Sequence, residues 1–301
     1  MKFVLVGGTG ALGKAIAKEI VARDHEFCNI SRNPEHSRKV LPNATAHSDF
    51  SQKNTNSLLS IFKEADVVIN LAGSNIASGR WTHAYKSMMY NSRIVTTNHI
   101  IDLMNQFSEE KTLISTSAIG YYGDQGDKLL DEHCSAGEDF LAKLCYDWER
   151  ASQNVNSNIR LVNPRIGVVL DKHFGALAKM LPAFRFFVGG PIGSGEQYFS
   201  WIHIQDYVNA IIEMSENSRY EGAYNLVAPN PVTMKDFAKE LGKTLHRPAL
   251  FRVPELALKL ILGESSYMVT ASQRVSSKRL ETKMFHFKFP ELDSALENLL
   301  G

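Results

Sequence analysis

The feature that most constrains the fold is a glycine-rich turn close to the start of the chain. The apolar run Phe3–Val6 leads directly into Gly7, Gly10 and Gly13, and a helix-compatible segment follows up to Ile20. Glycines at this spacing permit a tight turn, close approach of a ligand to the backbone and tight packing of the helix. The unpaired N–H groups at the start of that helix attract a diphosphate. The turn therefore predicts a dinucleotide site, with an ordinary strand-to-helix turn as the alternative.

Apolar strands and helical stretches alternate along the following sequence. This order favours the α/β class, a doubly wound parallel sheet covered on both faces. The chain of 301 residues has room for such a domain and a smaller lobe. We expect a nucleotide-binding domain over 1–170, with 201–228 packing back on it, and a C-terminal substrate lobe made of 171–200 and 229–301. Further strands are expected at 26–30, 44–47, 66–71, 112–115 and 159–162.

Composition excludes several classes of function. A formal net charge of +1 makes nucleic acid and anionic membranes poor partners. The three cysteines have no CxxC spacing and the ten histidines no HxxxH or HxH spacing, so no disulfide framework and no metal site is predicted. No long hydrophobic span follows the short apolar start, so we expect an unprocessed cytoplasmic protein, either a monomer or a homodimer.

The end of the second strand indicates which dinucleotide is bound. An acidic residue there accepts hydrogen bonds from the ribose 2′-hydroxyl of NAD, but this chain has Ser31 followed by Arg32. A guanidinium pairs with a 2′-phosphate. The pair predicts NADP(H) in preference to NAD(H), with a solvated loop charge as the alternative for Arg32.

Other cofactor contacts are expected at the carboxyl ends of the neighbouring strands. Asp49 follows the third strand and either accepts from the adenine amino group or caps the next helix. The small residues after the fourth strand let the cofactor backbone pass close by. The loop beyond them carries Trp81, either a substrate contact or a packing anchor. The expected cofactor residues of the turn and of the fourth strand are Gly7, Thr9, Gly10, Ala11, Leu12, Gly13, Leu71, Ala72 and Gly73.

Longer motifs carry a resemblance to a known family. The segments NLAGSNIASGRW, NSR at 91–93, STSAIGYYGDQGD, GALAKMLPAF, GGPIGSGEQYFSWIHIQD, LGESS and QRV resemble the extended short-chain dehydrogenase/reductase superfamily, also called the NAD-dependent epimerase/dehydratase family. Within it they are similar to the YfcH-like epimerase-family proteins. The resemblance covers essentially the whole chain. It implies a Rossmann domain with a small C-terminal domain, and it implies no particular substrate.

The resemblance also implies a catalytic set, which this sequence carries incompletely. Ser117 matches the hydroxyl that bonds the substrate oxygen, and Lys143 matches the lysine of the Tyr-x-x-x-Lys motif. The residue four positions earlier is Asp139, not tyrosine. Either a loop tyrosine, Tyr121 or Tyr122, supplies the acid beside Ser117 and Lys143, or the usual chemistry is lost. We take Tyr122 as the candidate acid and Tyr121 as a substrate contact, with loop packing as the alternative for both.

Two further residues, Arg165 and Tyr198, complete the expected site. Lys143 has a second expected role, because a lysine there hydrogen-bonds the nicotinamide ribose. Arg165 matches a segment that passes beside the nicotinamide, and its alternative is a structural ion pair. Tyr198 is expected to contact substrate, and His203 is expected to be a structural hydrogen-bonding residue.

These patterns predict an NADP(H)-binding epimerase, dehydratase or oxidoreductase. Its substrate is expected to be a small hydroxyl or carbonyl compound, possibly a nucleotide sugar. The alternative is an NADP(H)-sensing regulatory protein that has lost the Tyr–Lys chemistry.

Overall fold

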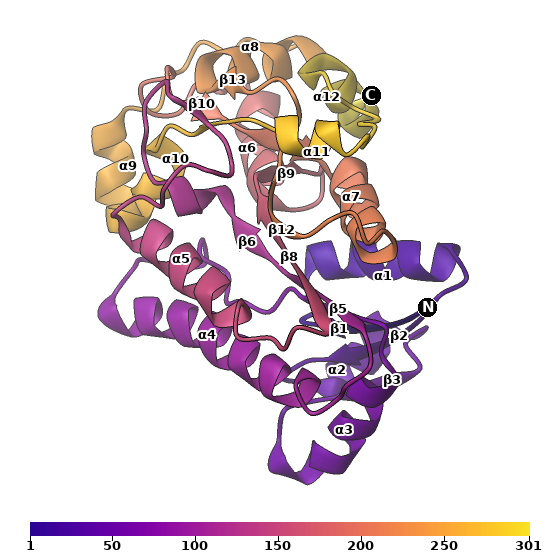
Figure 1. The fold of residues 1–301 in the computed structure, drawn as a ribbon. Coiled ribbons are helices and arrows are strands. Elements are labelled where there is room, and N and C mark those ends of the chain that lie inside the picture. The colour runs from indigo at the N-terminus through magenta and orange to yellow at the C-terminus, as the bar shows by residue number, and fades with distance from the viewer.

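A parallel sheet forms the centre of the molecule, which is described over residues 1–301 by a computed structural model (Figure 1). Its strands follow the order β3-β2-β1-β4-β5-β8-β12, and the direction of strand order reverses between β1 and β4. The short strand β6 pairs with the end of β8. The bounds are β1 (Lys2–Val6), β2 (Glu26–Ile30), β3 (Ala46–Ser48), β4 (Val67–Asn70), β5 (Lys111–Ser115), β6 (Ser117–Ala118), β8 (Ile159–Ile166) and β12 (Gly222–Leu226).

Helices cover both faces of the sheet because its buried strands are apolar on both sides. In β1, Phe3 and Leu5 share a core with α1 and α7, whereas Val4 and Val6 share another with α3 and α4. This alternation is the two-residue period of a strand. The bounds of these helices and their neighbours are α1 (Ala11–Ala22), α2 (Pro34–Val40), α3 (Thr55–Glu64), α4 (His83–Met104), α5 (Phe140–Ser152) and α7 (Ile204–Glu216).

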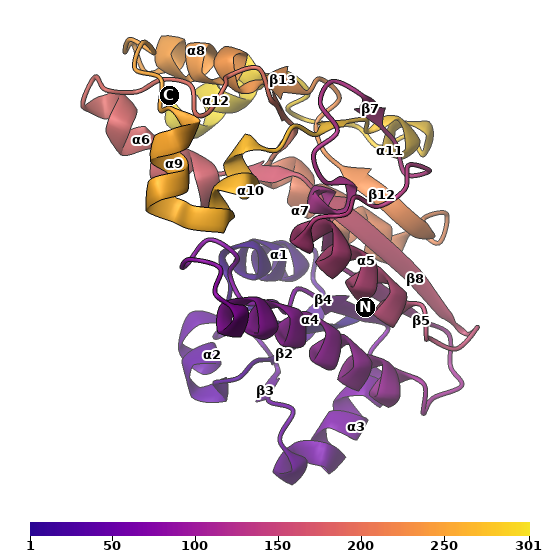
Figure 2. The same ribbon diagram turned by 90° about the vertical axis from the view of Figure 1, so that its left-hand side faces the viewer.

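The remaining elements form a second layer beyond the carboxyl ends of the strands (Figure 2). Its core joins α6, α8 and α12 around Trp201. The other elements of this layer are short. The bounds are β7 (Leu129–Leu130), β9 (Val168–Leu170), β10 (Tyr198–Phe199), β11 (Trp201–His203), β13 (Val232–Thr233), β14 (Arg274–Val275), α6 (Gly175–Arg185), α8 (Met234–Thr244), α9 (Glu255–Leu262), α10 (Tyr267–Thr270), α11 (Lys278–Thr282) and α12 (Leu292–Leu300).

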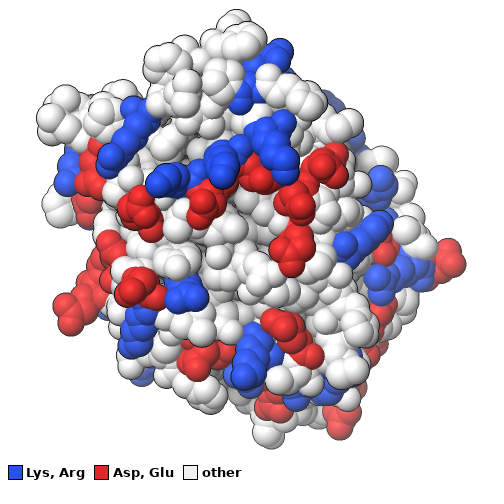
Figure 3. Space-filling view, turned by 90° about the horizontal axis from the view of Figure 1, so that it is seen from above, with Lys and Arg blue, Asp and Glu red and all other residues white.

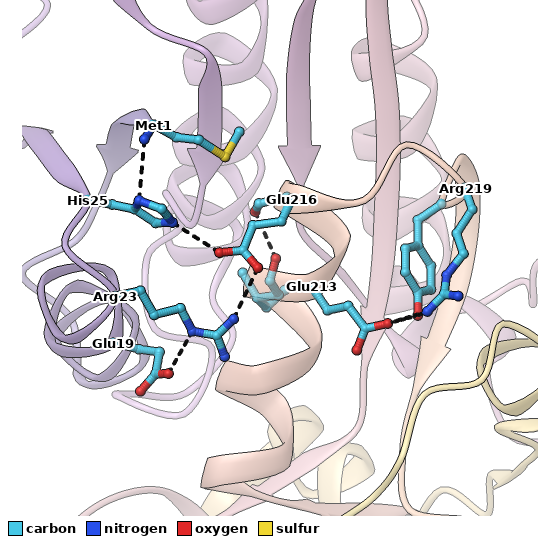
Figure 4. Close-up of polar contacts among 10 residues, drawn as sticks. Met1, Glu19, Arg23, His25, Glu213, Glu216 and Arg219 are labelled. Atoms are coloured by element: carbon cyan, nitrogen blue, oxygen red, sulfur yellow. Dashed lines mark hydrogen bonds and ion pairs between the residues drawn. The ribbon is translucent and has the colours of Figure 1, made fainter.

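A polar cluster ties α7 to the start of the chain (Figure 4). Glu216 at the end of α7 accepts hydrogen bonds of 3.0 Å from Arg23 Nη1 and from His25 Nε2. Arg23 also pairs with Glu19 on α1 at 2.8 Å. Together with the shared apolar core, these contacts attach residues 204–216 to the N-terminal half of the molecule.

The sheet is larger than the strand patterns predict. The strand expected to end at residue 162 continues through Pro164 to Ile166, because β12 pairs with Val162–Ile166 on one side and β6 pairs with Arg165 and Ile166 on the other. The strand expected at 44–47 lies at Ala46–Ser48. β12 itself has no counterpart among the predicted strands.

The surface carries charges of both signs. In the view from above, a short row of basic side chains is flanked by acidic ones, without a broad area of one sign (Figure 3). No helix of the structure combines the length and the hydropathy that a membrane crossing needs.

Candidate functional site

Two of the three glycines in the turn, Gly7 and Gly13, are required sterically within the protein, whereas Gly10 is not. Gly7 has a φ of +83°, and a Cβ there would lie 3.1 Å from Ala72 Cα. A Cβ on Gly13 would lie 2.5 Å from Gly8 Cα, so Gly13 allows α1 to pack against the turn. A Cβ on Gly10 would meet nothing closer than Gly7 O at 3.6 Å. Gly10 therefore faces open space, where a ligand can approach the backbone.

The N-terminus of α1 is open to an anion. Gly10 is its N-cap residue, no side chain caps it, and its first turn holds no acidic residue. The N–H groups of Ala11, Leu12 and Gly13 precede the first intrahelical bonds, so they lack partners within the helix. Thr9 is half-buried beside them. These features match the requirements of a diphosphate site.

A buried polar chain that the sequence analysis missed holds this turn in place. Asn29 on β2 accepts from Gly8 N at 3.0 Å and donates to Ser37 Oγ at 2.7 Å. Ser37 Oγ in turn lies 2.6 Å from His47 Nδ1. The sequence signal was Asn29 between the apolar residues Cys28 and Ile30 of the strand EFCNI, because a buried amide needs partners.

The end of β2 presents an unpaired cation. Arg32 is exposed, and no carboxylate lies within ion-pair distance of it. Ser31 Oγ donates to Asn33 O at 3.1 Å. Asn33 caps α2 by accepting from His36 N. Arg32 is therefore free to meet an anionic group.

Asp49 has a structural role in the turn before α3. Its Oδ1 accepts from Ser51 N and from Asn54 Nδ2, both at 2.8 Å. These hydrogen bonds lower the pKa of the Asp49 carboxyl. The geometry resembles the capping alternative, although Asn54 rather than Asp49 is the N-cap residue of α3.

The segment after β4 connects the glycine turn to a cationic side chain. Leu71 and Ala72 are half-buried, and Gly73 is exposed. A Cβ on Gly73 would lie 2.8 Å from the Arg93 guanidinium carbon. Asn70, which was not predicted from the sequence as a site residue, shapes this segment because its Oδ1 accepts a hydrogen bond from Ala72 N at 3.1 Å.

A cavity of about 220 Å³ opens between the sheet and the second layer. Arg93 on α4 is the one charged residue of its lining, and Gln273 contributes an amide side chain. Hydrophobic residues make up twelve of the sixteen that line it, so it is largely apolar. The lining consists of Ile76 and Arg93, of Ala118, Ile119 and Gly120, of Leu141, Leu144, Cys145 and Trp148, of Ile166, Gly167 and Val168, and of Tyr267, Met268, Ala271 and Gln273.

Ser117 lies at the margin of this cavity. It is buried, it precedes the lining residue Ala118, and its Oγ has no hydrogen-bond partner. Its neighbour is the thiol of Cys145, whose pKa burial raises to about 12. A buried hydroxyl without a partner is a candidate for bonding a ligand oxygen.

Lys143 is not brought to the cavity. Its side chain is 71% exposed and pairs with Asp147 at 2.9 Å, which raises the pKa of the Lys143 amine. Cys145 faces the cavity instead. Because the two residues are about 200° apart around a helix, only one of them can face Ser117. The sequence did carry a signal for the side of α5 that faces the cavity. It was the helical spacing of Leu141, Leu144, Cys145 and Trp148.

Tyr122 is also held away from the cavity. Its hydroxyl donates to Asn225 Oδ1 at 2.6 Å and accepts from Arg165 Nη1 at 3.0 Å. Arg165 is bound through Nε and Nη2 to the carboxylate of Glu149, both at 2.9 Å. Tyr121 stacks on the Arg165 guanidinium, 3.6 Å from its ring centroid. The geometry of Arg165 matches the structural ion pair, and burial raises the pKa of Tyr122 well above its usual range.

Trp81 and Tyr198 do not line the cavity. Trp81 is buried, donates through Nε1 to Ile76 O at 2.9 Å and packs against Phe140. This is the geometry of a packing anchor, and it supports the lining residue Ile76. Tyr198 lies in β10, where the Arg274 guanidinium covers its ring at 5.1 Å.

The C-terminal segment lines one side of the cavity. Tyr267 lines the cavity, and its hydroxyl donates to Asp139 Oδ2 at 3.1 Å and accepts from Asp124 N at 2.8 Å. Burial raises the pKa of Tyr267 to about 12. Arg80 donates to the carbonyl oxygens of Leu260 and Ile261 at the end of α9. These contacts join the loop after β4 and the start of α5 to the segment α9–α10.

Two family models match the chain. Residues 3–226 match the NAD dependent epimerase/dehydratase family. The chain belongs to this family. Residues 253–299 match a domain of unknown function, DUF1731, which contains α9, α10 and the C-terminal residues that line the cavity. The family resemblance and the Rossmann-type parallel sheet expected from the sequence are both confirmed.

Relatives of this family share the entire chain. An Arabidopsis thaliana protein named epimerase family protein SDR39U1 homolog, chloroplastic, is 36% identical over 100% of this chain and 87% of its own. The crystal structure of human epimerase family protein SDR39U1 with NADPH is 29% identical, has a TM-score of 0.88 and is matched over 99% of both chains. A nucleoside-diphosphate sugar epimerase from Corynebacterium glutamicum is 28% identical, with a TM-score of 0.77 over 100% of this chain and 58% of that one. A nucleotide cofactor is supported by these likenesses.

Proposed function

We propose that this protein is an NADP(H)-dependent oxidoreductase or epimerase that acts on a small hydroxyl or carbonyl compound. The observation that carries the proposal is the continuity between the diphosphate turn and the cavity. Gly7 lies against Ala72, Gly73 lies against Arg93, and Arg93 lines the cavity. In open α/β sheets, ligands bind at the carboxyl ends of the strands where strand order reverses, and this path lies there.

The residues of the cofactor end fit a dinucleotide phosphate. The open face of Gly10 and the uncapped start of α1 would hold the diphosphate. Arg32 has no carboxylate partner, so its guanidinium is available to a 2′-phosphate. The NADPH in the human relative's structure supports the same preference. Bound NADP(H) would supply or accept a hydride.

Where the nicotinamide and the substrate would meet, the groups that the chain itself contributes lie near the cavity. Ser117 Oγ is free to donate to a substrate oxygen on which charge develops. The largely apolar lining offers a ligand few competing hydrogen-bond partners near that position. We leave Tyr122 and Lys143 out of this set, since the hydroxyl of Tyr122 is already bonded and the amine of Lys143 is exposed. We further propose that residues 171–200 and 229–301 select the substrate.

A second candidate function is an NADP(H)-sensing protein. The observation that favours it is the absence of a tyrosine–lysine pair from the cavity lining. Occupancy of the cofactor site would then act through the segment α9–α10, which is tied to the loop after β4 by Arg80.

Binding and turnover are tested separately. NADPH binding is measured by the fluorescence of the reduced nicotinamide for the wild-type protein and for Gly10→Ala. A methyl group on Gly10 makes only an ordinary contact, 3.6 Å from Gly7 O, so this variant should change the melting temperature little while weakening NADPH binding. Stopped-flow screening against sugars, quinones and ketones then follows NADPH oxidation. Binding without any oxidation would favour the sensing function, and no binding would refute both functions.

A further inference from the structure

Arg93 is a cation without an anion. Its Nη1 donates to the backbone oxygens of Ser74 and Met89, at 3.2 and 3.1 Å. Its guanidinium carbon lies 5.1 Å from the centroid of the Trp148 ring. No carboxylate is within ion-pair distance, and burial lowers the pKa of Arg93. A poorly hydrated guanidinium in an apolar cavity gains most from a ligand that brings a negative charge.

The rest of the cavity offers little to a polar ligand. The Tyr267 hydroxyl is already bonded on both sides, to Asp139 and Asp124. The amide nitrogen of Gln273 donates to Gly123 O at 3.2 Å. Sugar hydroxyls placed here would find few partners, and burying an unpaired hydroxyl is costly.

The size of the cavity restricts its ligand further. The cavity volume of about 220 Å³ is below the range of roughly 300–1,000 Å³ usual for drug-sized ligands. Tyr267 and Met268 line it from the C-terminal segment, and Arg80 holds that segment to the loop after β4. A nucleotide sugar, with two phosphates and several hydroxyls, does not match this cavity.

We propose that the cavity binds a small, largely apolar carboxylate, with the carboxylate on Arg93 and the hydrocarbon part against Leu144, Trp148 and Ile166. This inference rests on the proposed function and specifies the substrate class of the same site. It replaces the nucleotide sugar suggested by the sequence with a compound that carries one negative charge and a short apolar body. A bidentate pair with the guanidinium would fix its orientation.

The test compares trans-cinnamate with its neutral amide, cinnamamide, by isothermal titration calorimetry. Each is titrated into the full-length protein with and without saturating NADP⁺, and UDP-glucose is titrated in parallel. The variants are Arg93→Gln, which removes the charge, and Arg93→Lys, which keeps it. Arg185→Gln is the control, because Arg185 is an exposed arginine on α6 without an ion pair. NADPH affinity is measured for every variant by nicotinamide fluorescence.

We expect cinnamate to bind and cinnamamide to bind at least tenfold more weakly. Arg93→Gln should weaken cinnamate at least tenfold, Arg93→Lys less, and Arg185→Gln not at all, with NADPH affinity unchanged throughout. The proposal is overturned if cinnamate fails to bind while NADPH binds, or if UDP-glucose binds more tightly than cinnamate. It is also overturned if Arg93→Gln and Arg93→Lys weaken NADPH as much as cinnamate, since the guanidinium would then serve the cofactor. Failure of NADPH binding alone refutes the proposed function, and the titration without cofactor still decides which ligand the cavity takes.

Discussion

The hydroxyl of Tyr122 donates a hydrogen bond of 2.6 Å to Asn225 Oδ1, which joins the loop after β5 to the edge strand β12. Tyr122→Phe leaves the amide oxygen of Asn225 and one N–H of Arg165 without this partner. We expect a loss of about 1–3 kcal/mol in the free energy of unfolding, because both groups are buried. Chemical denaturation measures it. NADPH affinity should not change. If Tyr122 were the proton donor, the variant would instead lose turnover without losing stability.

Ser117 and Lys143 should respond in opposite ways to truncation. Ser117→Ala removes the unpartnered hydroxyl beside Cys145, so we expect reduced turnover with NADPH binding retained. Lys143→Ala removes an exposed amine, so we expect no change in NADPH affinity, turnover or melting temperature. Steady-state kinetics and NADPH titration on the two variants check this. A loss of NADPH affinity in Lys143→Ala would restore the ribose-binding role expected from the sequence.

Arg32 should discriminate between the two nicotinamide cofactors. A charge-assisted bond to the 2′-phosphate is present with NADPH and absent with NADH, so Arg32→Ala should weaken NADPH by about tenfold or more and NADH very little. Dissociation constants for both cofactors are measured by nicotinamide fluorescence. An equal loss for both would contradict the assignment of the 2′-phosphate to Arg32.

His203 should make the folded protein sensitive to mild acid. It is buried at the start of α7, where its Nδ1 accepts from Gln205 N at 3.0 Å. Burial lowers the pKa of His203 from 6.5 to about 4. Between these values the unfolded chain binds more protons, so stability is full above pH 6.5 and falls as the pH drops toward 4. At pH 5 this amounts to about 2 kcal/mol.

The matched variant for this prediction is His203→Asn. Asparagine also serves as an N-cap acceptor but does not titrate in this range. Urea denaturation at pH 7.5 and pH 5 should show a smaller difference in unfolding free energy for the variant than for the wild-type protein. An unchanged difference would mean that other groups carry the acid sensitivity.

The cofactor end could be predicted from the sequence because its signals are local. The strand Phe3–Val6, the three glycines and the first helix adjoin in the chain, and steric and hydrogen-bonding rules act between neighbours. Arg32 likewise follows the second strand directly. Because apolar strands alternate with helices, the parallel sheet was also predictable, although β12 was missed because its pairing with β8 is between distant segments.

The reacting end was decided by tertiary packing. Whether Lys143 or Cys145 faces Ser117 depends on the rotation of α5, which the packing of Leu144 and Trp148 sets. Tyr122 has the right chemistry for an acid, but Asn225 and Arg165 arrive from distant strands and occupy its hydroxyl. Arg93 and Tyr267 meet at one cavity although they are far apart in the chain. Local sequence determines which groups a backbone turn can offer to a cofactor, whereas the surroundings of a side chain, and so its charge partners and reactivity, exist only once distant segments have packed together.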